Sequence, residues 1–228
     1  KIGTIGGSYS GATQYRMLAT QPPHLVAQFV RQSSSDYYIE WVYRSGVFEH
    51  GFNISWTLKH ASTNAAKLAP EGMEDEVVTR LTKASDDYQK WLEHVPISPL
   101  LPVADLQEWF VDWMDHPNQG EYWNEFSIVR SHDRVDVPVH HFGGWYDCFL
   151  RGTLENYVGM RSKAVNKQAR SGQRLTIGPW VHNPSPADMR TSGEVDFGEQ
   201  AKLGWFASRL RWFDYWLKGI DNGIGQEK

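Results

Sequence analysis

Cysteine and long apolar runs are scarce in this chain of 228 residues. The single cysteine, Cys148, excludes an internal disulfide and does not reveal the redox compartment. No apolar run is long enough to cross a lipid bilayer. Basic runs are also lacking, and the formal net charge of −4 disfavours binding to nucleic acid or to anionic membranes. We therefore expect neither nucleic acid nor a membrane among the partners of this chain.

Aromatic residues, in contrast, are abundant, with 11 Trp, 10 Tyr and 10 Phe. Most of them are expected to pack a core, and so many also suit an apolar substrate pocket. The length and the 40% hydrophobic content fit one large globular domain or a domain with an insertion. The chain begins at Lys1, directly before an apolar run of strand type, Ile2 to Ile5. We expect an excerpt of a longer protein, so the compartment, bacterial cytoplasmic or secreted, stays open.

A glycine-rich turn that carries a serine organises the rest of the chain. The stretch Gly6-Gly7-Ser8-Tyr9-Ser10-Gly11 follows the apolar run and leads into a predicted helix, Ala12 to Ala19. In a nucleophile elbow, a strained turn between strand and helix raises the serine hydroxyl above the sheet. We expect Ser8 to be this serine and the backbone N–H of Tyr9 to face a forming oxyanion. The glycines could also form an ordinary loop, so this interpretation requires an acid and a histidine downstream.

An acid and a histidine both follow predicted strands further along the chain. Asp147 comes after a strand predicted at Val139 to Phe142, and His182 after one predicted at Arg174 to Ile177, which is expected to end at Gly178-Pro179. The carboxyl ends of parallel strands meet at one edge of a sheet, so Ser8, Asp147 and His182 are expected to gather there. Serine needs a base to take its proton, histidine can take and return it near neutrality, and an acid fixes the imidazole tautomer.

The spacing of these residues predicts an insertion. Two βαβ units need only about 60 residues, far fewer than separate Ser8 from Asp147. The sequence pattern also changes in the intervening stretch, from strands that alternate with a helix to aromatic-rich and helical segments. We therefore predict an α/β fold with a parallel sheet, in which residues 1–35 and 130–228 form the core. Residues 36–129 are predicted to form a mostly helical cap whose aromatic residues wall the substrate pocket.

The clearest helical pattern lies near the end of the sequence, at Ala201 to Lys218. Its buried face is predicted from helical spacing to consist of Phe206, Leu210, Phe213 and Leu217, with Gly219 at the cap. Another helix is predicted to begin at Pro70, with acidic residues in its first turns, where the helix dipole favours negative charge.

Three ordered motifs resemble the cocaine esterase and X-Pro dipeptidyl-peptidase family of serine hydrolases. They are Gly-x-Ser-Tyr-x-Gly at residues 6–11, Gly-Trp-Tyr-Asp at 144–147 and Gly-Pro-Trp-x-His at 178–182. Further stretches similar to that family are Asp115-His116-Pro117, Gly193 to Gly198 and Arg211 to Gly219. The resemblance covers essentially the whole chain.

The resemblance implies an α/β-hydrolase core with a helical cap, together with a C-terminal β-sandwich and first sheet strands that would lie outside these residues. It implies that Ser8 is the nucleophile, Asp147 the acid and His182 the base, without a metal or cofactor. It also implies that the Tyr9 N–H is one oxyanion donor, the second being a tyrosine hydroxyl upstream of Lys1. Members of the family hydrolyse esters or amides.

Several other residues are candidates for roles at the site. Asp36, Trp145 and Trp180 could border the substrate pocket, but turn capping by Asp36 and packing beneath the site by the tryptophans compete with that interpretation. The adjacent pair His140-His141 would face opposite sides of a strand, so we expect structural roles rather than a metal site. Cys148 is expected to be a packed small residue rather than a nucleophile.

The leading functional hypothesis is a serine hydrolase that cleaves acyl esters or amides through a Ser-His-Asp triad and an acyl-enzyme intermediate. An X-Pro dipeptidyl-peptidase of the same mechanism is an alternative, and it would need an acidic or carbonyl-rich subsite for a free α-amine. A catalytically silent interaction module on the same fold is the alternative from another class, against which an intact triad argues. The expected partner is a small-molecule ester, amide or short peptide, and a homo-oligomer stays open.

Overall fold

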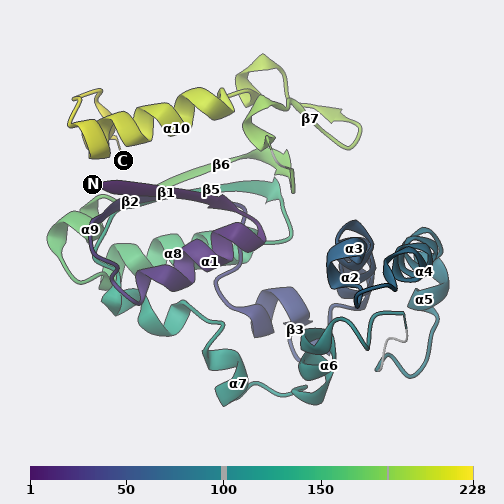
Figure 1. The fold of residues 1–228 in the computed structure, drawn as a ribbon. Helices are drawn as coiled ribbons and strands as arrows, with labels where there is room; N and C mark the ends of the chain where they lie inside the picture. Colours follow the sequence, from purple (N-terminus) through teal and green to yellow (C-terminus); the bar gives the residue numbers. More distant parts are fainter. Residues whose placement is uncertain (99–101, 184, 228) are drawn as a thin grey trace. The chain divides into compact units, whose positions relative to one another are not determined.

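The computed structural model describes residues 1–98, 102–183 and 185–227, and the chain divides into two compact units (Figure 1). The first unit comprises Lys1–Glu40 and Trp123–Lys228, and the second comprises Trp41–Tyr122. The predicted insertion, residues 36–129, contains the second unit and short flanks that belong to the first. Those flanks are aromatic: Tyr37 stacks on Phe126 with ring centroids 5.6 Å apart, within the first unit. That the insertion covers the site stays a prediction.

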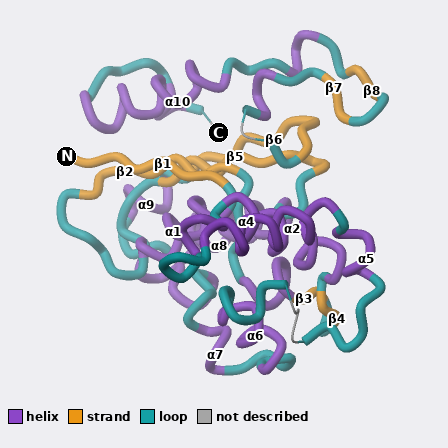
Figure 2. The backbone as a smooth tube through the Cα atoms, turned by 45° about the vertical axis from the view of Figure 1, so that its right-hand side comes forward, coloured by secondary structure: helices purple, strands orange, loops and turns teal. Residues whose placement is uncertain are grey.

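A parallel sheet forms the centre of the first unit. Among the described residues it has four strands in the order β1-β2-β5-β6, with every neighbouring pair parallel. Helices α1 and α8 cover one face of this sheet and α10 covers the other (Figures 1 and 2). The bounds of these elements are β1 Ile2–Gly7, α1 Tyr9–Leu18, β2 Leu25–Arg31, β5 Val139–Tyr146, α8 Leu150–Lys163, β6 Arg174–Val181 and α10 Trp205–Phe213.

The strand order brings together segments that lie far apart in the sequence. Strand β2 pairs directly with β5, with Phe29 opposite His140, although the whole second unit lies between them in the chain. Because all the strands run in one direction, their carboxyl ends share one edge of the sheet. The residues that follow β1, β5 and β6 are therefore neighbours, and these include Ser8, Asp147 and His182.

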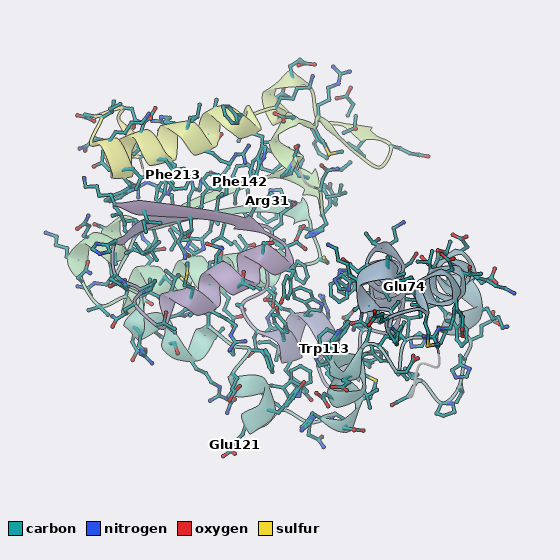
Figure 3. All side chains as sticks on the ribbon, in the orientation of Figure 1. Arg31, Glu74, Trp113, Glu121, Phe142 and Phe213 are labelled. Atoms are coloured by element: carbon teal, nitrogen blue, oxygen red, sulfur yellow. The ribbon has the colours of Figure 1, made fainter. Side chains whose placement is uncertain are left out.

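Aromatic rings fill the space between the sheet and α10. Phe142 on β5 and Trp180 on β6 are stacked, with centroids 4.9 Å apart and planes 9° from parallel. Trp205 of α10 meets the same Phe142 ring edge-on at 5.2 Å. Figure 3 shows Phe142 and Phe213 in this layer. Such aromatic pairs add about 0.5–1.5 kcal/mol each beyond the burial of their area.

The buried face predicted for the last helix is correct in part: Phe213 and Leu217 face the sheet, but Phe206 and Leu210 do not. Phe206 and Leu210 are 66% and 48% exposed, whereas Trp205 is 8% and Trp212 0% exposed. The helical period fits both stripes, and the tryptophan stripe prevails because its larger rings bury more apolar area. The helix continues as a π-helical turn, Asp214–Lys218, and ends at Gly219, whose φ of 74° is the left-handed cap predicted there.

Strand β6 runs through Gly178-Pro179 to Val181, so the prediction that these residues end it was wrong. Proline is tolerated on an edge strand, and β6 is an edge of the sheet among the described residues. Strand β5 likewise extends beyond Phe142 through two glycines. A Cβ atom on Gly144 would lie 2.1 Å from the carbonyl oxygen of Trp180, so only glycine allows the strands to meet here.

The second unit is helical. Its α4 begins at Glu74 rather than at Pro70, and Glu74, Asp75 and Glu76 occupy its first turn as the dipole favours. The helices of this unit pack around one apolar cluster that includes Leu58, Leu81 and Phe110. Its helices and hairpin strands are β3 Tyr43–Arg44, β4 Val47–Phe48, α2 His50–Thr63, α3 Ala65–Leu68, α4 Glu74–Asp86, α5 Tyr88–Leu92, α6 Glu108–Asp115 and the first residues of α7 Glu121–Asn124.

The remaining elements of the chain are short. None of the helices within the described ranges is both long enough and apolar enough to cross a membrane. The short elements are the π-helical turn Tyr38–Val42, the 3-10 helices Val129–Arg134, Pro186–Asp188, Glu199–Ala201 and Ile224–Gln226, helix α9 Lys167–Ser171, and strands β7 Thr191–Ser192 and β8 Val195–Asp196.

Candidate active site

Ser8 occupies a strained turn between β1 and α1. Its φ of 57° and ψ of −128° are unusual for a residue with a side chain, and such strain costs about 1–3 kcal/mol. Hydrogen bonds hold the turn in place: the N–H of Ser8 donates to the Arg31 carbonyl at 3.0 Å, and the Ser33 hydroxyl donates to the Ser8 carbonyl at 2.8 Å. A Cβ atom on Gly6 would lie 2.3 Å from the Ser10 carbonyl oxygen. The strand–turn–helix context predicted for this stretch is therefore observed.

The three residues predicted to act together lie within hydrogen-bonding distance of one another. Ser8 Oγ is 3.0 Å from His182 Nε2, and His182 Nδ1 is 2.6 Å from Asp147 Oδ2. In the tautomer that satisfies both bonds, Nδ1–H donates to the carboxylate and Nε2 accepts the serine proton. The Asp147 side chain is fully buried and that of His182 is 34% exposed. The arrangement thus has a shielded carboxylate and an imidazole that solvent can reach.

Both oxygens of the Asp147 carboxylate are engaged. Oδ2 accepts from His182, and Oδ1 accepts from the backbone N–H of Phe149 at 2.7 Å. The Phe149 ring meets the imidazole of His182 edge-on, with centroids 5.4 Å apart. The turn after β5 therefore fixes both the carboxylate and one side of the imidazole.

Sequence reasoning missed Gln32, which holds the residues on both sides of His182. Its side-chain N–H donates to the carbonyl of Val181 at 2.7 Å, and its side-chain oxygen accepts from the N–H of Asn183 at 3.1 Å. The backbone carbonyl of Gln32 also accepts from the N–H of Ser8 at 3.2 Å. Gln32 is fully buried and has a φ of 45°. Gln32 directly follows the parallel strand β2, and this position in the sequence could have indicated a residue near the site.

Arg31 supports the same edge of the sheet. Its guanidinium donates to the Gln32 side chain at 2.8 Å and to the carbonyl of Asn183, and it lies 5.8 Å from the Trp205 ring centroid. Burial lowers the pKa of Arg31, and the negative charge of Asp147 opposes that shift. Figure 3 shows Arg31 in the layer between the sheet and α10. Sequence reasoning did not single out this residue.

A buried carboxyl lies where the loop after β2 meets α8. Glu40 Oε1 accepts from the backbone N–H of Ser35 and from its hydroxyl, the latter at 3.0 Å, and the same hydroxyl lies 2.7 Å from Glu155 Oε2. Burial raises the pKa of Glu40 to about 7, opposed by these bonds and by one from the N–H of Gly152. Gly152 is in the first turn of α8, so Glu40 caps that helix from another segment.

The three predicted pocket residues have different environments. Asp36 is buried, and its Oδ1 accepts from the N–H groups of Tyr38 at 2.8 Å and Ile39 at 3.2 Å, which is the turn-capping alternative. Trp180 is 1% exposed, and its indole N–H lies between the Met189 and Ala201 carbonyls. It therefore packs beneath the sheet edge and is not available to line an open pocket.

Trp145 is 59% exposed beside Asp147, so the expectation that it packs beneath the site was wrong and the pocket-lining alternative stays open. Cys148 is exposed as well, which corrects the prediction of a packed residue. Trp145 is the penultimate residue of β5, and Cys148 lies in the short connection between β5 and α8. Tyr9 is the first residue of α1, where helix N–H groups lack intrahelical acceptors.

The adjacent histidines on β5 face opposite sides of the sheet, as expected from the strand period. His140 pairs with the Thr176 hydroxyl at 2.9 Å, and His141 pairs with the Tyr15 hydroxyl at 2.8 Å. Burial lowers the pKa of each histidine to about 3, so both stay neutral at physiological pH. Their contacts are those of core residues.

Known proteins were compared with the chain by fold and by sequence. An α-amino acid ester hydrolase shares the fold with a TM-score of 0.62 at 20% identity, over 97% of this chain and 35% of that protein. An aminopeptidase from the marine sediment archaeon Thaumarchaeota archaeon does so with a TM-score of 0.64 at 18% identity, over 96% and 35%. These likenesses show that the chain shares its fold with both proteins.

Sequence similarity leads to the same group of proteins. The cocaine esterase of Rhodococcus sp. (strain MB1 Bresler) is 25% identical over 187 residues, which are 80% of this chain and 31% of that enzyme. The chain thus spans about a third of the length of the relatives it matches. The family model described as X-Pro dipeptidyl-peptidase (S15 family) matches residues 1–184. With most of its length matched, the strained serine turn included, this chain belongs to the X-Pro dipeptidyl-peptidase (S15) family.

Proposed function

We propose that this chain carries the catalytic residues of a serine hydrolase that cleaves acyl esters or amides. One observation carries the proposal: a continuous hydrogen-bonded chain runs from Ser8 Oγ through both nitrogens of His182 to the buried carboxylate of Asp147. The roles follow from chemistry. Ser8 is the nucleophile, His182 the base and Asp147 the group that fixes the imidazole tautomer.

In the acylation step, Ser8 Oγ attacks the carbonyl carbon of the substrate while His182 Nε2 takes the hydroxyl proton. The imidazolium that forms is stabilised by Asp147, whose second oxygen is already held by the Phe149 N–H. Collapse of the tetrahedral intermediate transfers the proton from Nε2 to the leaving alcohol or amine. Ser8 is left as an ester of the acyl group.

The negative charge of the tetrahedral intermediate forms near the start of α1. The Tyr9 backbone N–H is the donor we assign to this oxyanion, and the dipole of the ten-residue helix adds positive potential there. Deacylation reverses the roles. His182 takes a proton from water, the resulting hydroxide attacks the acyl carbon, and Ser8 is released with its proton restored.

Esters or amides that need no free α-amine are the first candidate class of substrates. Asp36, the carboxylate that the sequence suggested at the border of the pocket, is buried, and its side chain caps a turn. It therefore gives little support to an amine subsite, which an X-Pro dipeptidyl-peptidase needs. That peptidase activity is kept as the second candidate, because the matching family model carries its name.

The triad is tested by covalent labelling. A fluorophosphonate probe should add one label to the protein, on the peptide that contains Ser8, and Ser8→Ala should prevent labelling. Ser10→Ala is the matched control, since Ser10 is an exposed serine in the first turn of α1, two residues after Ser8, and should not be needed. Labelling that survives Ser8→Ala would refute the assignment. A panel of p-nitrophenyl butyrate and Gly-Pro-p-nitroanilide then distinguishes the two substrate classes.

A further inference from the structure

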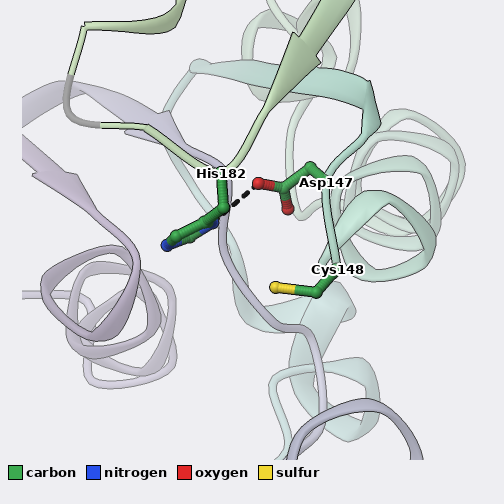
Figure 4. Close-up of side chains that lie close together, drawn as sticks. All are labelled: Asp147, Cys148 and His182. Carbon is green, nitrogen blue, oxygen red and sulfur yellow. Dashed lines mark hydrogen bonds and ion pairs between the residues drawn. The ribbon is translucent and has the colours of Figure 1, made fainter. Parts of the chain in front are cut away.

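Cys148 lies beside the triad and has no part in the proposed reaction. It is the single cysteine of the chain, directly follows Asp147 and is exposed. Its sulfur, one carboxylate oxygen of Asp147 and one ring nitrogen of His182 all lie within 4.8 Å of one another. Figure 4 shows the Cys148 side chain extending to the same side as the hydrogen-bonded pair.

This set of atoms has the chemistry of a zinc site. Thiolate sulfur, imidazole nitrogen and carboxylate oxygen are the ligands that Zn²⁺ takes from proteins. Zinc–ligand distances of about 2.0–2.3 Å in a tetrahedral site put two ligand atoms roughly 3.3–3.8 Å apart. The sulfur lies at most 4.8 Å from the other two ligand atoms and approaches that range by a small rotation of the exposed Cys148 side chain. The oxygen and nitrogen of the hydrogen-bonded pair Asp147 and His182, 2.6 Å apart, move apart by about 0.7 Å to reach it. The fourth position would belong to water.

Charge and access agree with this chemistry. A Cys148 thiolate and the Asp147 carboxylate together balance the charge of a divalent zinc ion. His182 is 34% exposed and Cys148 is exposed, so the ion can reach both from solvent. Magnesium and calcium prefer oxygen ligands and would not be held by this set. These ligand types therefore favour Zn²⁺ over magnesium and calcium.

We propose that Asp147, Cys148 and His182 form a site at which Zn²⁺ binds and reversibly inhibits the enzyme. The inhibitory effect rests on the proposed function, because the ion would bind the same imidazole and carboxylate that activate Ser8. On binding, the thiol proton is released to solvent and the His182 proton resides on the ring nitrogen that does not bind zinc. Bonds form from zinc to sulfur, nitrogen and oxygen, without oxidation or reduction. His182 is then no longer oriented by Asp147 to accept the Ser8 proton.

Metal binding can be tested without reference to activity. Titration of the protein with Co²⁺, a spectroscopic substitute for zinc, should produce a thiolate-to-cobalt charge-transfer band at one equivalent, and Zn²⁺ should remove it. Cys148→Ser, which keeps the size of the side chain but loses the sulfur, should abolish the band and weaken zinc binding by at least about tenfold. Ser8→Ala leaves all three ligands in place and should retain the band.

Inhibition is tested on ester hydrolysis, with each variant compared with its own rate in the absence of metal. Zinc should inhibit the wild type reversibly, with activity restored by EDTA, while magnesium and calcium should not inhibit. The zinc concentration needed for half inhibition should rise by at least about tenfold in Cys148→Ser. If that variant folds poorly, capping the native thiol with methyl methanethiosulfonate gives the same comparison.

The metal site is overturned if the cobalt band does not form, or if zinc affinity is unchanged once Cys148 is replaced or capped. Zinc binding through Cys148 without any inhibition of a working hydrolase would overturn the inhibitory role. A protein that binds zinc through Cys148 but hydrolyses neither esters nor amides would instead overturn the proposed function. Retention of the cobalt band in Ser8→Ala separates these failures, because it reports the metal site in a variant that lacks the nucleophile.

Discussion

The side chain of Gln32 brackets His182. Its amide donates to the carbonyl of Val181 at 2.7 Å and accepts from the N–H of Asn183 at 3.1 Å, the two residues that flank the histidine. Its own carbonyl accepts from the N–H of Ser8, so one buried residue is bonded to the nucleophile turn and to the histidine loop. We therefore expect the distance between His182 Nε2 and Ser8 Oγ to depend on Gln32.

We predict that Gln32→Leu lowers kcat for ester hydrolysis by about 10–100-fold and leaves KM nearly unchanged. Leucine has a similar volume but cannot hold the histidine loop, so Nε2 is no longer kept at 3.0 Å from Ser8 Oγ. Steady-state kinetics on p-nitrophenyl butyrate provide the measurement.

Gln28→Leu is the control for Gln32→Leu. Gln28 is also fully buried on β2, and its side chain donates to the Gln14 carbonyl at 3.1 Å, but it has no bond to the site. Its replacement should lower stability without lowering kcat. Equal losses of kcat in the two variants would mean that Gln32 acts only through general stability.

The triad residues are predicted to act as one unit. Asp147→Asn and His182→Ala should each lower kcat by about 10⁴-fold or more, and the double variant should lose little beyond the larger single effect. Once the base is lost, the group that orients it has nothing left to orient. Pre-steady-state and steady-state rates of the two single variants and the double variant measure this. Multiplicative losses would show that the two residues act independently.

The candidate site was more predictable from the sequence than the packing around it. Serine on a glycine turn, followed by an acid and a histidine after later strands, is constrained by the chemistry of acyl transfer, so residue types in order were enough. Gln32 was missed because a glutamine after a strand has many possible roles, and only the three-dimensional structure reveals which carbonyl and N–H groups lie beside it.

Errors in the predicted fold arose where two patterns competed. On α10, a stripe of Phe206 and Leu210 and a stripe of Trp205 and Trp212 both fit the helical period, and ring size settled which stripe is buried. Pro179 was expected to end β6, but a strand at the edge of a sheet tolerates proline. Whether a strand lies at an edge depends on the tertiary structure, so the local sequence did not reveal it.

The two tryptophans near the site are predicted to respond differently to replacement. Trp180→Leu should lower the free energy of unfolding by about 2–4 kcal/mol, because it removes the stack on Phe142 and leaves the Ala201 carbonyl without its indole partner. Trp145→Leu should change stability by less than about 0.5 kcal/mol, since Trp145 is largely exposed, and should change KM. Denaturant unfolding and kinetics on both variants make the comparison. A stable Trp180→Leu protein with altered KM would reverse these assignments.

Glu40 is predicted to make stability depend on pH. Burial raises its pKa from 4.5 to about 7, so between these values the folded protein keeps a proton that the unfolded chain has released. Stability should therefore fall as pH rises from about 4.5 to 7, by about 1–3 kcal/mol for this residue. Glu40→Gln should flatten that decline, and the exposed Glu125→Gln should not. Urea unfolding at pH 5 and pH 8 measures the slope, and an unchanged slope in Glu40→Gln would contradict the prediction.

The acyl-enzyme itself is the most direct test of the account. The protein would be mixed with p-nitrophenyl butyrate, quenched in acid within the first turnover, digested and analysed by mass spectrometry. We predict a butyryl group on the peptide that contains Ser8, formed together with a burst of p-nitrophenol and reduced to background in His182→Ala. Turnover of the ester with no acyl group on that peptide, or with the acyl group on another residue, would contradict the proposed mechanism.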